Sequence, residues 1–112
     1  MRPNIPFFTL EEVKILSLKI IGSNFFSKYF STRQLADRII VDKYKIPERC
    51  LFTESEYTPL QKFIKKQLNH VMRDFKKLEY IWKYSNRFWQ IMDKERINTD
   101  PRLINEWRRE KR

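Results

Sequence analysis

The sequence predicts a mostly helical α+β domain that carries one small antiparallel hairpin and an extra helix at the C-terminus. Three observations predict it. Apolar residues recur at spacings of three and four from Leu60 to Leu78, which is the period of an amphipathic helix. Two runs rich in aromatic and β-branched residues follow at once, at 79–84 and 87–92. The 112 residues are 41% hydrophobic and 15% aromatic, which is enough for one domain with a genuine core.

The N-terminal segment is expected to hold an arm, a helix and a short strand. Residues 1–8 contain two prolines and predict an extended arm. Thr9 is placed to cap a helix in a capping box with Glu12, and Gly22, the only glycine, is placed to end that helix. The aromatic connector of residues 25–30 can then supply a short strand that joins the hairpin as a third member.

The second predicted helix begins at a strong capping signal. Ser31 is the expected N-cap, and Gln34 stands where a capping box needs it. Arg33 and Arg38 on this helix are candidate phosphate contacts. A polar stretch at 42–57 separates this helix from the next one.

The third and longest predicted helix runs from about residue 59 to 78. Thr58 is the expected N-cap, Pro59 the first helical residue, and Gln61 can close a capping box. The side opposite the apolar stripe is cationic and carries no acid: Lys62, Lys65, Lys66, Asn69, Arg73 and Lys76. Such a face is either merely solvated or binds a polyanion. Like charges three or four residues apart cost helix stability, which favours the second interpretation.

The two aromatic runs predict a hairpin, because Ser85 and Asn86 between them are turn formers. Lys83 and Arg87 then bracket its tip with positive charge. Alternation does not say which set of side chains faces the core. The rings either fill the core or, if exposed, stack unpaired bases of a single strand, and for that role the candidates are Tyr80, Trp82 and Tyr84.

The C-terminal segment, residues 93–112, is expected to end in a helix. Residues 93–98 are a linker or a single helical turn, and Asp100 followed by Pro101 is a strong helix start. The apolar residues of this last helix serve either a homodimer or the domain's own core: Leu103, Ile104 and Trp107.

Charge and composition exclude several classes of protein. The net charge is +10, and residues 59–92 hold eight Lys or Arg against two Asp or Glu, a net of +6, which is the footprint of a polyanion-binding surface. One cysteine and one histidine are too few for a structural zinc site. We find no catalytic constellation, cofactor motif, signal peptide or membrane-length apolar run, and therefore expect an intracellular protein that is not an enzyme.

From Thr9 to Met92 the order of helix, short strand, helix, helix and hairpin resembles the winged helix-turn-helix superfamily. The segment Ser31-Thr-Arg-Gln-Leu-Ala-Asp-Arg-Ile looks like the first helix of the motif, 59–78 like the recognition helix and 79–92 like the wing. The chain departs from that pattern at 42–57, because the turn between the two motif helices usually has about three or four residues. The composition also looks like that of small archaeal or viral regulators.

The resemblance implies sequence-specific binding of double-stranded DNA, with transcription regulation as the role and a homodimer as the assembly. Base edges would be read from the recognition helix by Asn69, Gln61 and Lys62 or Lys66. Phosphates would be held by further cations of both helices and the wing: Arg33, Lys65, Arg73, Lys76, Lys83 and Arg87. Two alternatives stay open. One is a winged-helix module that binds protein in a transcription or replication complex, and the other is a binder of RNA or single strands.

Overall fold

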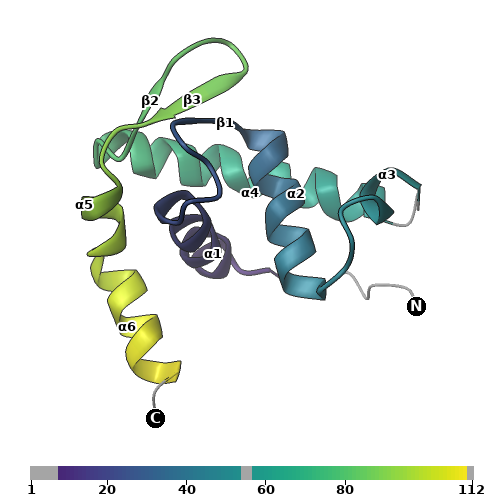
Figure 1. The fold of residues 1–112 in the computed structure, drawn as a ribbon, viewed down its shortest axis with the longest axis horizontal. Helices are drawn as coiled ribbons and strands as arrows, with labels where there is room; N and C mark the ends of the chain where they lie inside the picture. The colour runs from purple at the N-terminus through teal and green to yellow at the C-terminus, as the bar shows by residue number, and fades with distance from the viewer. Residues whose placement is uncertain (1–7, 54–56, 111–112) are drawn as a thin grey trace.

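The computed structural model describes residues 8–53 and 57–110, so the predicted N-terminal arm, apart from Phe8, lies outside the described residues. Figure 1 shows a helical body from which a hairpin projects, with the C-terminal helices along one side. The elements are α1 (Leu10–Gly22), β1 (Tyr29–Ser31), α2 (Thr32–Tyr44), α3 (Cys50–Thr53), α4 (Thr58–Lys77), β2 (Ile81–Lys83), β3 (Phe88–Ile91), α5 (Lys94–Asn98) and α6 (Pro101–Glu110). The predicted mostly helical α+β class is confirmed.

The three strands form one antiparallel sheet in the order β1-β3-β2. The short strand expected in the aromatic connector is therefore present, and it pairs with the second strand of the hairpin. Phe30, Ile81 and Ile91 point from the sheet into the core and are buried. These three residues identify the inward face that the alternation in the sequence left open.

The core lies between α1, α2 and α4, which pack on one another, and the inner face of the sheet. The predicted stripe of α4 is buried from Leu60 to Phe75, and Leu78 at its end is half-buried. Each fully buried aliphatic or aromatic side chain contributes about 1.5–3 kcal/mol of transfer free energy. This burial holds the cationic side of α4 toward solvent. Among the described helices none is long and apolar enough to cross a bilayer.

The predicted capping box is half formed at the start of α1 and complete at the start of α2. The Oγ1 atom of Thr9 accepts a hydrogen bond from the N–H of Glu12 at 3.0 Å. The carboxylate of Glu12 pairs with the Nζ atom of Lys43 at 2.8 Å, an ion pair between α1 and α2. At α2 the capping box is complete, because Ser31 and Gln34 each accept the other's backbone N–H, at 3.1 and 2.9 Å.

The polar stretch at 42–57 is shorter and more structured than predicted. Helix α2 continues through Tyr44 and ends at Lys45, whose φ of 55° is left-handed. A short helix, α3, follows, while residues 54–56 lie outside the described part of the chain. The prediction that Thr58 caps α4 is wrong. Thr58 is the first helical residue, and the cap residue Tyr57 makes no side-chain capping bond.

The predicted first strand of the hairpin begins two residues too early. Glu79 has a left-handed φ of 61° and belongs to the turn that ends α4, where the N–H of Tyr80 donates to the carbonyl oxygen of Phe75 at 2.9 Å. Strand β2 begins only at Ile81. Tyr80 is buried and its hydroxyl donates to Asp100 at 2.7 Å, so Tyr80 cannot be one of the base-stacking rings.

The first helix ends at Gly22 as predicted, but not through a left-handed glycine cap. Gly22 is the last residue of α1, the cap residue is Ser23, and no glycine in the described chain has a positive φ. A Cβ atom at Gly22 would lie only 3.2 Å from Cγ2 of Ile97 and 3.0 Å from Cγ of Asn98. The side-chain amide of Asn98 donates to the carbonyl oxygen of Gly22 at 3.0 Å. The glycine therefore permits α5 to approach α1 closely.

Of the two alternatives predicted for residues 93–98, the helical one is confirmed: residues 94–98 form the short helix α5, and Asp93 is its N-cap. Helix α6 begins at Pro101 as predicted. The prediction of a dimer surface on α6 is wrong for Leu103, which is buried in the domain's own core. Ile104 is half-buried, and Trp107 is 42% exposed. Of the three residues, Trp107 is thus the one that the fold leaves open to solvent.

A buried polar cluster attaches α6 to the rest of the domain. The Asp100 carboxylate is 3% exposed and accepts hydrogen bonds from Tyr80 at 2.7 Å and from the guanidinium of Arg102 at 3.1 Å. Arg102 also pairs with Asp74 of α4 at 2.9 Å. Burial, followed by the hydrogen bond to Asp100, raises the pKa of Tyr80 to about 12. Burial alone would raise the pKa of Asp100, but its bonds to Arg102 and Tyr80 outweigh burial and lower it.

Candidate nucleic-acid interface

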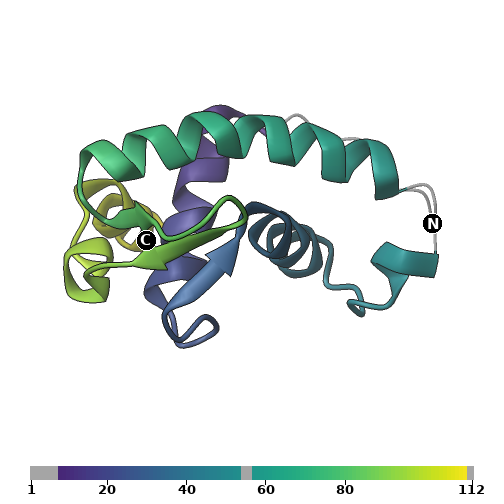
Figure 2. The same cartoon turned by 90° about the horizontal axis from the view of Figure 1, so that it is seen from above.

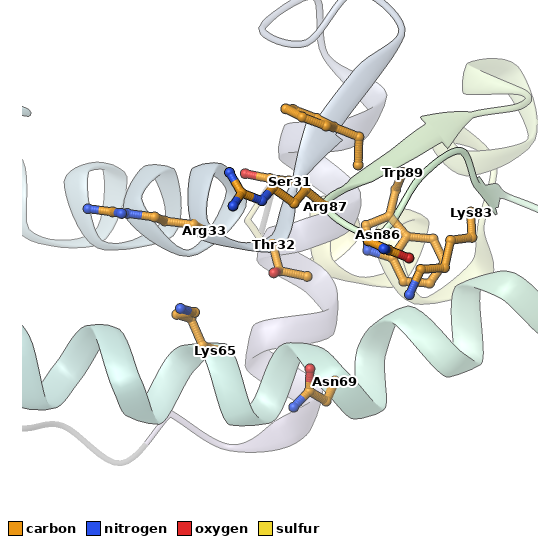
Figure 3. A pocket seen from close by; sticks show the side chains of 10 residues that line it. Ser31, Thr32, Arg33, Lys65, Asn69, Lys83, Asn86, Arg87 and Trp89 are labelled. Carbon is orange, nitrogen blue, oxygen red and sulfur yellow. The ribbon is translucent and has the colours of Figure 1, made fainter.

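A groove of about 620 Å³ opens between the start of α2, the solvent side of α4 and the tip of the hairpin. Figure 2 looks down on this side of the molecule, with α4 along one edge, α2 seen end-on next to it and the hairpin tip beside α2. The close view in Figure 3 shows Lys65 and Asn69 on α4 pointing toward Thr32 and Arg87. The residues that line the groove are polar or cationic, apart from the rings of Phe88 and Trp89. They are Ser31, Thr32, Arg33, Lys65, Asn69, Lys83, Asn86, Arg87, Phe88 and Trp89.

A second hollow of about 320 Å³ continues this groove toward the C-terminal end of α4. The two share four lining residues, and the second adds Met72, Arg73 and Lys76. We call the two hollows together the basic groove. Helix α4 presents its residues there at positions 65, 69, 72, 73 and 76, the spacing of one helix face.

Six cations converge on the basic groove from three elements, and no carboxylate lines it: Arg33, Lys65, Arg73, Lys76, Lys83 and Arg87. Within the described residues none of the six lies within 4 Å of a carboxylate, whereas other cations of the chain do have such partners. Charges of one sign held close together repel one another, so an anion entering the groove relieves that repulsion.

The start of α2 adds further positive potential to the groove. Its first residues line the groove, and its first turn contains no acid. The N-terminus of a helix carries a partial positive charge and exposes backbone N–H groups. The Ser31 hydroxyl is engaged in the capping box, which leaves the Thr32 side chain as the hydroxyl on this rim.

The structure contradicts the predicted role of Gln61 in reading bases. Its side-chain amide donates to Oδ1 of Asp37 on α2 at 3.0 Å, and this bond joins α4 to α2. The pKa of Asp37 is raised, because the effect of burial exceeds the lowering by the hydrogen bond from Gln61 and by the nearby charge of Arg33. Gln61 therefore has a structural partner and does not line the basic groove.

Three other predicted contacts lie outside the groove. Lys62 and Lys66 are exposed on α4 but line neither hollow. Arg38 pairs with Asp42 at 3.1 Å, and its guanidinium lies 4.3 Å from the ring centroid of Phe25. The groove thus contains seven of the eleven residues predicted to touch DNA: Arg33, Lys65, Asn69, Arg73, Lys76, Lys83 and Arg87.

The sequence reasoning missed Thr32, Asn86 and Trp89 as groove residues. Thr32 immediately follows the predicted cap of α2, so the expected direction of that helix could have identified it. Asn86 was recognised only as a turn former. Trp89 is half-buried beneath the hairpin, with the Nζ atom of Lys83 5.4 Å from its ring centroid. Its position depends on the sheet register, which the sequence did not define.

In comparisons with known proteins, no family model matches the chain, and neither curated proteins nor solved structures yield a significant match. In residues 8–53 and 57–110 no three side chains of His, Cys, Asp or Glu gather as metal ligands would.

Proposed function

We propose that this chain binds double-stranded DNA in a sequence-specific manner through the basic groove and acts as a transcription regulator. The observation that carries the proposal is the convergence of six cations from α2, α4 and the hairpin on one surface, where no carboxylate of the described residues lines the groove or lies within 4 Å of these cations. Neutralising several DNA phosphates releases their counterions, and this release supplies much of the binding free energy.

The order of elements supports a winged helix-turn-helix arrangement. Helices α1, α2 and α4, with β1 before α2 and the hairpin β2–β3 after α4, follow the order of that superfamily. In this arrangement α4 is the recognition helix and the hairpin is the wing, while α3 is an addition within the turn. The twenty residues of α4 span about 30 Å, long enough to lie in a major groove.

The side chains of the basic groove divide into two roles. Asn69 lies midway along the solvent side of α4, and an asparagine can contact the edge of adenine with two hydrogen bonds. The six cations would hold phosphates, which orients the duplex without reading its sequence.

Two features weigh against other functions of this groove. A protein-binding module would present an apolar surface, whereas four lysines or arginines meet in the first hollow alone. Among the described residues no carboxylate, histidine or cysteine lines either hollow, and we assign the groove a binding role. A homodimer, if formed, would use Trp107 and the half-buried Ile104 of α6.

The test is fluorescence anisotropy with a labelled random-sequence duplex at low salt. The wild-type chain should bind it with about micromolar affinity. The double variant Lys65→Glu, Arg73→Glu should lose this binding, since each change places a negative charge in the groove. The matched control Arg49→Glu, Arg108→Glu changes the net charge equally at exposed sites elsewhere and should bind with much smaller loss. Absent wild-type binding, or equal loss in both variants, would overturn the proposal.

A further inference from the structure

The outer face of the sheet is an exposed aromatic surface. Because Tyr29 and Trp82 both pair with Gln90, the three side chains form one row across the sheet, on the face opposite the buried Phe30 and Ile81. The same alternation adds three further residues to this face: Tyr84, Phe88 and Met92. All these apolar residues are exposed, with Trp82 at 58% and Tyr84 at 61%. We call this surface the aromatic face.

The rings of the aromatic face are arranged as a platform. Strand β3 separates β1 from β2, yet the rings of Tyr29 and Tyr84 approach to 4.5 Å between centroids and so meet across β3. Isolated apolar residues on a surface are ordinary, but a contiguous patch of rings indicates a binding surface. The flat faces of aromatic side chains stack on other flat, apolar groups.

Charge around the aromatic face limits what can cover it. The Nζ atom of Lys28 lies 5.6 Å from the Tyr29 ring, and that of Lys76 lies 5.8 Å from the Trp82 ring. The three strands and the turn between β2 and β3 contain no acid. A second copy docked by this same face would bring like charges together, because a twofold interface places each patch against itself. A partner with flat groups and negative charge fits both features.

The aromatic face also adjoins the basic groove. Phe88 belongs to the aromatic face and also lines the groove. Lys76 lines the groove, and its Nζ atom lies 5.8 Å from the ring centroid of Trp82. A nucleic acid strand that leaves the groove at the hairpin therefore meets aromatic rings next.

We propose that the aromatic face stacks unpaired bases of a single strand that continues from a duplex held in the basic groove. This second site rests on the proposed function, since the groove holds the duplex part. Its ligand is a junction between double-stranded and single-stranded nucleic acid. Stacking on a ring tolerates any base, because every base has an aromatic face.

The test compares three labelled probes by anisotropy: a blunt duplex, and the same duplex with a 5′ or a 3′ extension of about eight thymidines. The wild-type chain should bind one of the extended probes at least about fivefold more tightly than the blunt duplex, which is the gain from one stacked base. The variant Tyr29→Thr, Tyr84→Thr should lose this gain and keep its affinity for the blunt duplex. Threonine preserves strand propensity, and the single variant Tyr84→Thr, beyond the end of β2, checks the result with less risk to folding.

A second readout locates the contact. The extended probe should quench tryptophan fluorescence more strongly than the blunt duplex does. Trp82→Phe should remove this additional quenching. Trp107→Phe, at an exposed site on α6, is the matched control and should leave the additional quenching in place.

The outcomes separate this inference from the proposed function. Equal affinity for blunt and extended probes, or a gain that survives Tyr29→Thr, Tyr84→Thr, would overturn the aromatic site while the duplex function stands. Binding of single-stranded thymidines without binding of the blunt duplex would overturn the duplex function and the junction with it. A dimer seen by sedimentation that Tyr84→Thr dissolves would assign the face to a second copy and overturn the inference.

Discussion

The salt dependence of duplex binding follows from the count of cations in the basic groove. If all six contact phosphates, the plot of log affinity against log salt should have a slope of about −5, because each contact contributes about −0.9. A fourfold rise in salt should then weaken binding roughly 10³-fold. The triple variant Lys65→Gln, Arg73→Gln, Lys83→Gln removes half of the contacts. Its slope should fall to about −3, and the same rise in salt should cost it only about 40-fold.

Anisotropy titrations of one duplex at four or five salt concentrations measure both slopes. The matched control carries three substitutions of the same charge at exposed positions away from the groove: Lys45→Gln, Arg49→Gln and Arg108→Gln. Its slope should stay near that of the wild type, because long-range charge effects are screened beyond about 10 Å. An unchanged slope in the groove variant, or an equal fall in the control, would refute the assignment of these cations to phosphates.

Three further predictions concern stability and are measured by thermal or urea unfolding. Gly22→Ala should destabilise the fold by about 1–3 kcal/mol, because the new methyl group meets Asn98; an unchanged midpoint would show that α5 shifts freely. Asp100→Ala should cost about 2–4 kcal/mol, since it leaves the buried Tyr80 hydroxyl without its acceptor. Because the folded pKa of Asp100 is lowered, its contribution is present at neutral pH and disappears as pH falls through and below 3.8, so wild type and variant should converge in acid. Asp37→Asn should stabilise the chain at neutral pH. Because the folded pKa of Asp37 is raised, this gain should be absent below 3.8, where the carboxyl is protonated in both states, and should grow as pH rises through the raised pKa, the opposite trend to that of Asp100.

The elements that local pattern determines could be predicted from the sequence. The stripe and the cationic side of α4 follow from a 3.6-residue period alone, and the Ser31 capping box involves residues only three apart. Most of the basic groove could therefore be anticipated, because α4 and the hairpin tip supply six of its seven predicted residues.

Two of the failures involve partners distant in the sequence. Gln61 has the spacing of a capping residue, but Asp37, 24 positions earlier, takes its amide. Gly22 matches a helix-ending signal, but the reason for a glycine there is Asn98, 76 positions later. Sequence patterns assign a role to Gln61 and Gly22 from their neighbours in the chain. In the folded protein their roles depend on contacts with residues far away in the sequence.

The aromatic hairpin shows a different limit. Both strands carry bulky apolar residues at adjacent positions, so alternation alone cannot select the inward face. The pairing of β1 with β3 makes that selection, since it turns Phe30 and Trp89 toward the domain and Tyr29 outward. The exposed rings then follow from a contact between segments about sixty residues apart.

The cations of α4 are spaced in a way that destabilises a helix, and they lie at or beside the groove where DNA binding is proposed. Lys62, Lys65 and Lys66 lie close to one another, as do Arg73 and Lys76, and like charges at such spacings destabilise a helix by a few tenths of a kcal/mol per pair. The helix tolerates this cost because its apolar stripe is buried along nearly its whole length. Other cations in the fold, such as Arg102 and Lys43, do have carboxylate partners. Among the described residues no carboxylate lies within 4 Å of these α4 cations, and such local conflicts with stability are expected at functional sites.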